Sequence, residues 1–555
     1  MAKQYDVIVV GGGHNGLVHA AYLARAGLDV CVLEARPIIG GATVTEEIFP
    51  GFRYSVFSYV VSLMRPEIIR ELDLPRHGLA ILPLESTLTP LPDGDRLYRD
   101  ADHHRTWRDI ARFSIRDAEA YDDYGRSLFF MARAVKDLLD IVPPDPSRLA
   151  PGDIAGMLRL ARHFLGLEPD QLHLLVKLMT MSAADFLEEW FETDVLKATL
   201  SASGIIGTFL GPRSPGTAYV LLHHYMGEID GHFRAWGFAK GGTGAVAQAI
   251  ASAAREAGAE IRTDAPVARV VVKNGRVRGV ALANGDEVRA KAVSSSLDPR
   301  RTFLDLVDEN ELPDEVVQGV RGYRFRGSSG KVNLALDAAP DFSCMPGHGP
   351  HLRGAVSISP SLDYLERAYD DAKYGDFSRE PYIDIVIPSA IDPGMAPPGK
   401  HVMSCFVQYA PYELREGTWD EKRDAFGDTV IDTLARYVPN LKDIILHRQV
   451  VTPLDIERTT GLSQGNIFQG ELTPSQLFFL RPVAGYAKYR TPVRGYYQCG
   501  SGTHPGGGIM GAPGKLAAGV VLGDFGRGRG GRRKMATGKG RVERRRSRPE
   551  RASGR

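Results

Sequence analysis

The chain has 555 residues, of which 43% are hydrophobic and 24% charged, and its net charge is +1. This length exceeds what one hydrophobic core usually organises, so we expect two or more lobes. The sequence contains no stretch of about 18 uninterrupted apolar residues, which argues against an integral membrane protein. Its four cysteines are widely separated, so we expect neither a CxxC dithiol relay nor a metal site.

The N-terminal segment predicts a nucleotide-binding βαβ unit. The apolar run 5–10 suits a buried parallel strand, residues 17–26 repeat apolar positions at helical spacing, and a second short strand, 30–33, ends on Glu34. Between the first strand and the helix lies a GxGxxG motif, formed by Gly11, Gly13 and Gly16. In such units the glycines permit a tight turn, a close approach of pyrophosphate and close packing of helix on strand, while the acid accepts ribose hydroxyls.

The residues after Glu34 distinguish between dinucleotides. A carboxylate at Glu34 would repel a 2′-phosphate, which disfavours NADP. Arg36, Gly40 and Gly41, in the pattern ExRxxxGG, look like the extended fingerprint of two-dinucleotide-domain flavoproteins, in which they follow the ribityl and pyrophosphate part of FAD. We therefore predict FAD as the cofactor; a glycine turn in an ordinary α/β domain is the alternative.

The segment 105–235 is predicted to be mainly helical. Stretches such as SLFFMARAVKDLLDIV repeat apolar residues at helical spacing, and the segment carries no recognisable catalytic motif. We expect a cap or substrate-binding insertion here. His223 and His224 lie where this segment ends, and we interpret them as core or surface residues.

The chain is predicted to return to the first lobe at Gly237. A glycine turn and an alanine-rich helix are followed by strands with hairpin turns at Asn274-Gly275 and Asn284-Gly285. In flavoproteins of this architecture the residue at Val267 lies on a strand beside the adenine, whose edge its backbone can bind. An ordinary strand valine is the alternative.

Residues 331–336, 382–387 and 402–408 are predicted strands of a second sheet, which we assign to a substrate domain. Near the C-terminus a strand at 496–499, a glycine turn and a helix at 512–522 repeat the first arrangement, and the helix N-terminus could face the flavin pyrimidine. No acidic-ended second strand follows, so we expect no separate NAD domain and predict oxygen or a quinone as the electron acceptor.

The predicted elements divide the chain into six segments. The FAD-binding parts are 1–104, 236–305 and 476–525, the helical cap is 105–235, the substrate sheet is 306–475, and the tail is 526–555. The tail holds 13 Lys+Arg against 2 Asp+Glu, leaving a body with 55 basic and 65 acidic residues. It has almost no apolar residues, so we expect disorder, with a solvated tail and attraction to anionic lipid or nucleic acid as the alternatives. Specific nucleic-acid binding is not expected.

The motifs GHNGLVHAAYLARAG, WGFAKGGTGAVAQAI and CGSGTHPGGGIMGAPG carry a family resemblance. The sequence resembles the phytoene desaturase and carotenoid isomerase group of FAD-dependent oxidoreductases over nearly all but the tail. The resemblance implies a monoamine oxidase-like α/β fold, with a Rossmann-like FAD-binding domain, a mixed-sheet substrate domain and a helical cap. The predicted FAD-binding residues are Gly11, Gly13, His14, Asn15, Gly16, Glu34, Ala35, Arg36, Gly40, Gly41, Ala42, Val267, Gly502 and Met510.

The expected chemistry is hydride transfer from a C–H bond of a small apolar substrate, polyene or lipid-like, to flavin N5, or a flavin-assisted double-bond isomerisation. An amine or amino-acid oxidase and a flavin-bound regulatory protein with low turnover are the alternatives. His504 is a candidate polar group near the flavin ring, with loop bracing as the other interpretation. Arg481 and Gln476 could contact substrate or flavin, or act as structural clamps. No catalytic residue is assigned.

The first predicted strand begins almost at the N-terminus, so we expect no signal peptide and a cytoplasmic location. The basic tail is expected to permit peripheral membrane contact. The family resemblance implies a mitochondrial location for animal relatives. Assembly into a homo-oligomer is left open.

Overall fold

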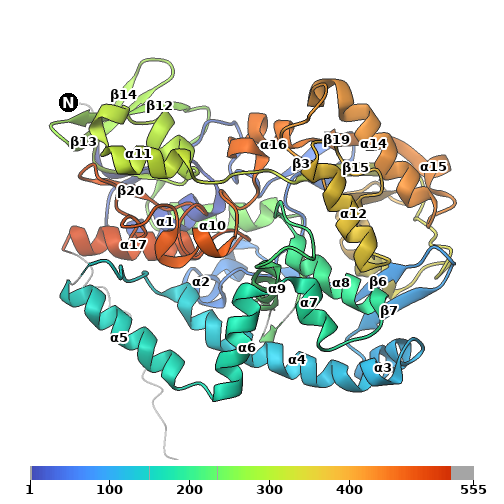
Figure 1. Ribbon diagram of the computed structural model, residues 1–555. Helices are drawn as coiled ribbons and strands as arrows, with labels where there is room; N and C mark the ends of the chain where they lie inside the picture. Colours follow the sequence, from blue (N-terminus) through green and yellow to red (C-terminus); the bar gives the residue numbers. More distant parts are fainter. Residues whose placement is uncertain (1–2, 149, 230, 234, 527–555) are drawn as a thin grey trace, which may run out of the picture.

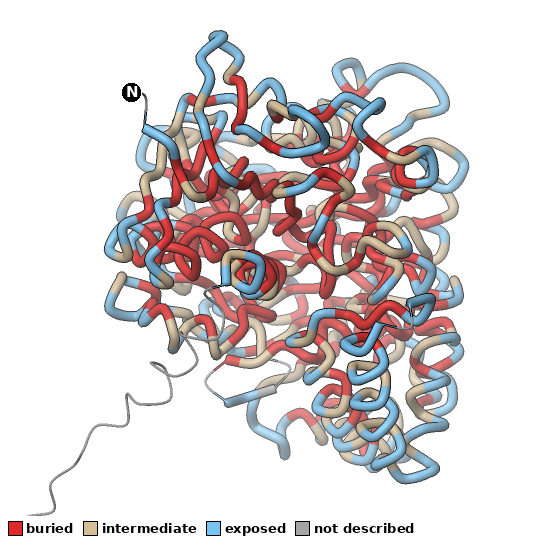
Figure 2. Tube along the Cα trace, turned by 90° about the vertical axis from the view of Figure 1, so that its left-hand side faces the viewer, coloured by how far each residue is buried: buried red, intermediate tan, exposed pale blue. Residues whose placement is uncertain are grey.

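The computed structural model describes residues 3–148, 150–229, 231–233 and 235–526, so the predicted tail lies outside it from residue 527 onward. Two lobes lie side by side, each built on a seven-stranded sheet, and a group of helices covers their lower side in the view of Figure 1. In Figure 2 the buried residues fill the middle of the molecule, and the exposed ones follow the outer loops and helices.

The first sheet contains the N-terminal strand at its centre. Its order is β11 (Glu260–Arg262), β2 (Val30–Leu33), β1 (Gln4–Val10), β14 (Glu287–Ser295), β13 (Arg276–Leu282) and β12 (Val267–Lys273), with β20 (Tyr496–Gln498) also pairing with β14. The pairing is parallel between β11 and β2, β2 and β1, β1 and β14, and β14 and β20. It is antiparallel between β14 and β13 and between β13 and β12. The strands predicted at 5–10, 30–33 and 496–499 are thereby confirmed, and three distant parts of the chain meet in one sheet.

Helices cover both faces of the first sheet, because β1 buries apolar side chains on each side. Val7 and Val9 face α1 (His14–Arg25), which packs against α10 (Gly244–Glu256) and α17 (Ala512–Asp524). Ile8 and Val10 lie in a different cluster that includes α11 (Asp314–Arg321). Burial on both faces explains why these strands are continuous apolar runs.

The second sheet is mixed. Its order is β19 (Ile445–Val451), β15 (Ser329–Leu336), β18 (His401–Gln408), β17 (Tyr382–Val386), β16 (Ala355–Ile358), β6 (Ser86–Pro90) and β7 (Arg96–Asp100). All neighbours are antiparallel except β16 and β6. The predicted strands at 331–336, 382–387 and 402–408 are confirmed. Residues 86–100 pair in this sheet, although they fall inside the segment 1–104 predicted for FAD binding. The prediction missed this because the pattern of two short hairpin strands does not indicate which sheet they join.

The outer helices of this lobe are α12 (Leu362–Lys373), α13 (Pro388–Ile391), α14 (Trp419–Ala435), α15 (Leu441–Ile444) and α16 (Pro453–Thr460). Short elements link the lobes, namely α2 (Pro66–Glu71) and the strand pairs β3–β4 (Thr45–Phe49 and Phe52–Ser55), β5–β10 (Ile81–Pro83 and Gly237–Ala239) and β8–β9 (Glu228–Ile229 and His232–Phe233).

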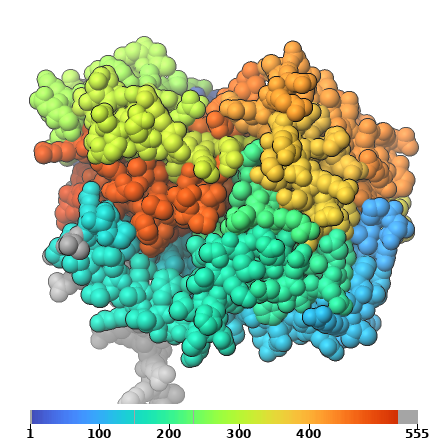
Figure 3. Space-filling view, in the orientation of Figure 1, coloured from blue at the N-terminus to red at the C-terminus, as the bar shows by residue number. Residues whose placement is uncertain are grey.

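The cap is helical, as its apolar spacing predicts. It comprises α3 (His103–Ala111), α4 (Ile115–Lys136), α5 (Pro151–Leu165), α6 (Pro169–Thr180), α7 (Ala183–Glu188), α8 (Asp194–Ile205) and α9 (Thr217–Tyr225). These helices form the cyan-to-green lower part of the surface in Figure 3. Their core is rich in aromatic rings; Tyr124 contacts Phe186 and Phe191 edge-on or tilted. Among the described residues, no helix combines the length and hydropathy that crossing a bilayer requires.

Candidate functional site

The GxGxxG turn has the geometry that its glycines predict. Gly11 adopts φ +91°, in the left-handed region, and its N–H donates to the carbonyl of Leu33 at 2.8 Å. A side chain on Gly16 would clash with the carbonyl oxygen of Gly11, so this glycine lets α1 lie against the end of β1. The turn therefore brings the N-terminus of α1 to the carboxyl edge of the sheet.

Three glycines leave a free space in front of this helix terminus. Gly13 and Gly40 form an isolated bridge, and a Cβ atom on Gly41 would lie 3.4 Å from the Cα of Gly13. A Cβ atom on Gly13 would meet no atom closer than the carbonyl oxygen of Gly40, at 4.0 Å. The first turn of α1 has neither an acidic side chain nor a side-chain cap, so its backbone N–H groups are available to a pyrophosphate.

The carboxylate of Glu34 lies at the end of β2, buried beside this space. It accepts hydrogen bonds from the N–H of Gly12 at 2.7 Å and of Arg36 at 2.9 Å. The segment that leads to Val267 runs alongside, because the N–H of Ala265 donates to the carbonyl of Glu34 at 2.9 Å. Ala35, by contrast, is exposed.

Several buried polar atoms in this region have no partner among the described residues. They are His14 Nε2, Asn15 Oδ1 and Arg36 Nη1, all on residues predicted to bind FAD. An unpaired buried polar atom costs about 1–3 kcal/mol, so their concentration indicates a polar ligand. The open glycine wall and these three atoms together fit the ribose and pyrophosphate of FAD.

The C-terminal signature joins the same region. The N-terminus of α17, which follows Met510, packs on the start of α1, and a side chain on Gly514 would clash with the carbonyl of Asn15. Asn15 Nδ2 donates to Ser501 Oγ at 2.9 Å. The N–H of Gly502 is bonded to Gln469 Oε1 at 2.8 Å, and Met510 is buried in the core shared with the cap. Two helix N-termini thus converge, which favours negative charge there.

A mainly apolar cavity lies where the two lobes and the cap meet. The predicted FAD residues His14 and Ala42 line one side, together with Ser501 and Ile509 of the C-terminal signature. The remaining walls come from the second sheet, the cap and the linking strands and include Tyr59, Ile206, His224, Trp236, Lys331, Phe406 and Phe468. The cavity therefore connects the predicted cofactor site to the second sheet.

Lys331 is the unexpected residue of this cavity. It is 2% exposed on β15, and its Nζ donates to the carbonyl of Ser55 at 2.6 Å. Burial lowers its pKa to about 7, because the charged ammonium loses its hydration. The sequence did hold a signal: a lysine in an otherwise buried strand, SGKVNLAL, is costly unless it has a function.

The carboxylate of Asp384 lies in line with Lys331 across the strands of the second sheet. On β18, Phe406 pairs with Lys331 on one side and with Asp384 of β17 on the other, so the three side chains share one face. Tyr59 stacks on Phe406, with ring centroids 5.6 Å apart, and its hydroxyl donates to Asp384. Burial raises the pKa of Asp384 to about 6. Sequence reasoning missed this group, because its members are far apart in the chain.

The weak catalytic candidate His504 braces the cap. Its ring bonds to the carbonyl of Leu138 at 2.8 Å, and Phe478 contacts it edge-on. Burial lowers the pKa of His504 to about 4, and the residue is not among those that line the cavity. The loop-bracing interpretation therefore fits its contacts better than catalysis.

Arg481 and Gln476 have the contacts of structural clamps. Arg481 is completely buried and donates to the backbone carbonyls of Phe468, Gly470, Glu471, Gln476 and Ser501. Gln476 bonds to the backbone of Arg324. Of the two histidines, His224 lines the cavity and stacks on Trp236, whereas His223 bonds to the carbonyl of Gly507 at 3.3 Å.

Comparison with known proteins gives a family and a fold. Residues 16–522 match the model of the family described as flavin containing amine oxidoreductase. The chain is 41% identical to "Pyridine nucleotide-disulfide oxidoreductase domain-containing protein 2" of Rattus norvegicus, over 95% of this chain and 94% of that protein. The four cysteines of this chain are buried and free, so a disulfide-reductase chemistry does not follow from that name.

More distant relatives have named activities. The chain is 28% identical to a component of the limonene dehydrogenase of Castellaniella defragrans, over 94% of this chain and 95% of that one, and 24% identical to the chloroplastic "Prolycopene isomerase" of Daucus carota, over 95% and 81%. A solved structure of putrescine oxidase is similar with a TM-score of 0.56, at 16% identity, covering 95% of this chain and all of that one. This likeness confirms the predicted monoamine oxidase-like α/β fold.

Proposed function

The chain belongs to the flavin-containing amine oxidoreductase family, and from this premise we propose that it oxidises an apolar, polyene or lipid-like substrate. It is an FAD-dependent oxidoreductase. When bound, FAD supplies the acceptor for a hydride from a substrate C–H bond, or assists a double-bond isomerisation. Oxygen or a quinone is the proposed final electron acceptor.

The observation that carries the proposal is the composition of the cavity. Apolar side chains dominate its walls away from the cofactor side, among them Phe57, Val60, Leu63, Ile206 and Phe468. Burial of a hydrocarbon in such a site contributes about 25 cal/mol of binding free energy for each Å² of apolar surface removed from water. The named activities of the limonene dehydrogenase relative and the prolycopene isomerase support the same substrate class.

Lys331 is the proposed proton acceptor of the oxidation. Loss of a hydride and formation of a double bond require that a proton leave the neighbouring carbon. With a pKa of about 7, a substantial fraction of Lys331 is neutral at physiological pH, and a neutral amine can accept that proton. The bond to the carbonyl of Ser55 orients Nζ in the cavity wall.

The test is anaerobic reduction of the purified flavoprotein. A polyene-containing lipid extract and a panel of monoterpenes are added separately, and the oxidised flavin absorbance at equilibrium and its rate of loss are recorded. The proposal expects bleaching by an apolar fraction, slowed at least tenfold in Lys331→Met. An exposed lysine, Lys442→Met, is the matched control and should leave the rate unchanged. Conversion of substrate without bleaching would indicate isomerisation, and neither result would favour a flavin-bound protein with low turnover.

An amine oxidase is the second candidate, because aromatic rings line the cavity. Tyr59 and Phe406 are stacked, and Trp236 lies on His224 with ring centroids 5.7 Å apart. Such rings can hold a protonated amine. The ammonium form of Lys331 would repel that cation in the same cavity, which is why we rank this function second. Bleaching by an amine panel and not by the apolar fractions would reverse the ranking.

Peripheral contact with a bilayer is part of the proposal, and the cap offers a surface for it. Apolar side chains are exposed on α5 and α6, with Leu165 84% exposed, Leu158 58% and Val176 55%. Arg159 and Arg162 lie among them on α5, as in helices that rest in the interface of an anionic membrane. An apolar substrate could pass from such a bilayer to the cavity.

Vesicle sedimentation tests this contact. The full chain is mixed with vesicles of neutral or anionic phospholipid, and Leu158→Asp/Leu165→Asp is compared with the control Leu446→Asp, an exposed residue of β19. The double variant should lose most of the bound fraction. Equal binding of all three proteins would remove the cap helices from the proposal and leave the basic tail as the contact.

A further inference from the structure

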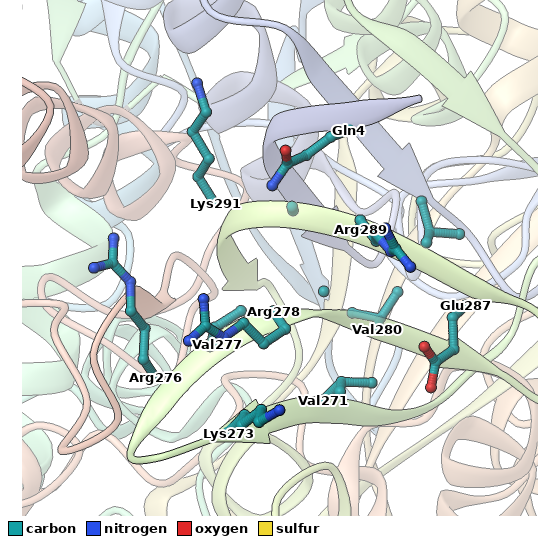
Figure 4. Close-up of a pocket in the computed structure, with 13 residues that line it drawn as sticks. Gln4, Val271, Lys273, Arg276, Val277, Arg278, Val280, Glu287, Arg289 and Lys291 are labelled. Carbon is teal, nitrogen blue, oxygen red and sulfur yellow. The ribbon is translucent and has the colours of Figure 1, made fainter. Parts of the chain in front are cut away.

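The outer hairpins of the first lobe carry a groove that the oxidoreductase chemistry does not use. It has a volume of about 450 Å³, in the range of small-molecule sites, and lies on β12, β13 and β14. Figure 4 shows its side chains along these strands, with Arg276 and Lys291 on one side and Glu287 on the other. None of the residues that line it lines the apolar cavity.

The groove concentrates positive charge. Five basic side chains line it, against the single carboxylate of Glu287: Lys273, Arg276, Arg278, Arg289 and Lys291. Lys273 pairs with Arg276, and a register shift that leaves Arg278 out of the β12–β13 pairing puts Arg289, opposite Gly279, on the same face. Val270, Val277 and Ala290 belong to the core cluster on the other face. An adjoining hollow of about 460 Å³ shares Arg276 and Lys291 and adds Arg494, together with Arg490 and its ion-pair partner Asp524.

This arrangement costs the fold stability. Lys273 lies directly opposite Arg276 in the β12–β13 hairpin, and Arg276 forms a bridge with Arg494, so like charges face each other twice. Such pairs are destabilising. Of the five basic side chains, Lys291 pairs with Asp6 at 2.7 Å, as lysine and arginine side chains elsewhere in the described structure commonly pair with a carboxylate. Lys273, Arg276, Arg278 and Arg289, by contrast, form no ion pair with any described residue.

Overall charge does not explain the groove either. Apart from the C-terminal tail, the chain has 55 basic and 65 acidic residues, so the average surface is acidic. Arginine guanidinium groups bind phosphate oxygens in pairs, and several cations around one hollow match adjacent phosphates rather than a single anion. No aromatic ring lies among the described residues that line the groove of Figure 4, so it offers no platform for stacked bases.

We propose that this groove binds a small ligand that carries two or more adjacent phosphates. The cations from three strands contact the phosphate oxygens, and Glu287 limits the site at one end. Binding would relieve the repulsion between the paired cations, so the ligand would also stabilise the hairpins.

The experiment uses the full-length, FAD-loaded protein and sodium tripolyphosphate as the probe. Hydrogen exchange is followed by mass spectrometry, because peptides from residues 267–295 report on the groove separately from the basic tail. We expect slower exchange in these peptides, with half-saturation at least tenfold higher for orthophosphate than for tripolyphosphate. The variant Arg278→Glu/Arg289→Glu should raise the half-saturation for tripolyphosphate at least tenfold.

The matched control is Arg255→Glu/Arg367→Glu, which changes the net charge equally at two exposed arginines outside the groove. It should leave the protection of 267–295 unchanged. The proposal is overturned if tripolyphosphate protects only the tail, if both double variants weaken binding equally, or if orthophosphate binds as well as tripolyphosphate. Protection by anionic vesicles without protection by tripolyphosphate would likewise overturn it and identify a lipid surface instead.

Discussion

Replacing Lys331 by methionine should change how the stability of the protein depends on pH. Burial lowers the pKa of Lys331 from 10.5 to about 7, so between these values the unfolded chain holds a proton that the folded chain has released. Stability therefore rises with pH across this window, and the lysine destabilises the fold most at its acidic end. Methionine fills a similar volume and cannot titrate, so the variant lacks this component.

The size of the effect follows from linkage. One proton difference corresponds to about 1.36 kcal/mol for each pH unit, so about 2 kcal/mol accumulates between pH 7.5 and 9. Urea unfolding of the flavin-loaded proteins at these two pH values measures it, with Lys442→Met as the control for an exposed lysine. The stability of Lys331→Met relative to wild type should fall by about 2 kcal/mol as the pH rises. Parallel changes in the two proteins would refute a depressed lysine pKa.

Three further substitutions test separate parts of the site. Gly13→Ala should fold normally, since Gly13 has φ −68° and a Cβ atom there would meet no atom closer than 4.0 Å. The variant should nevertheless lose FAD at least tenfold more readily, as measured by the absorbance of bound flavin. Full retention of FAD would place the pyrophosphate elsewhere. Arg481→Met removes the side chain that donates to five backbone carbonyls. It should lower the free energy of unfolding by at least about 3 kcal/mol, as measured by urea unfolding. A stability within about 1 kcal/mol of wild type would contradict the role of Arg481 as a structural clamp. His504→Gln should lower the melting temperature, yet the rate of flavin reduction by the substrate fraction that bleaches the wild type should stay within threefold. A decrease of a hundredfold or more in this rate, in a flavin-loaded protein, would restore His504 as a catalytic candidate.

Local sequence signals predicted the cofactor half of the molecule well, because its chemistry lies in contiguous motifs. The turn at Gly11, the helix after it and the acid at Glu34 follow one another within a single βαβ unit. The periodicity of apolar residues and the spacing of the glycines are therefore enough to predict them. The hairpin turn at Asn274-Gly275 also follows from local chemistry, and both residues adopt positive φ as that turn requires.

The substrate half could not be assembled from the sequence, because its geometry depends on sheet register. Lys331 and Asp384 lie on strands that are far apart in the chain, and only their common pairing with Phe406 places them on one face. A shift of one residue in either pairing would turn one of them to the opposite face of the sheet. Similarly, nothing in the pattern of residues 86–100 indicated that this hairpin would join the second sheet.

The charges on this face of the second sheet connect the register to the choice of substrate. At neutral pH, Asp384 is largely ionised, since its pKa is about 6, whereas Lys331 with a pKa of about 7 is divided between its two forms. A protonated amine entering the cavity would disfavour the ammonium form of Lys331, so binding would release a proton. A hydrocarbon that displaces water from Lys331 likewise favours the neutral form, which can accept the proton of the oxidation.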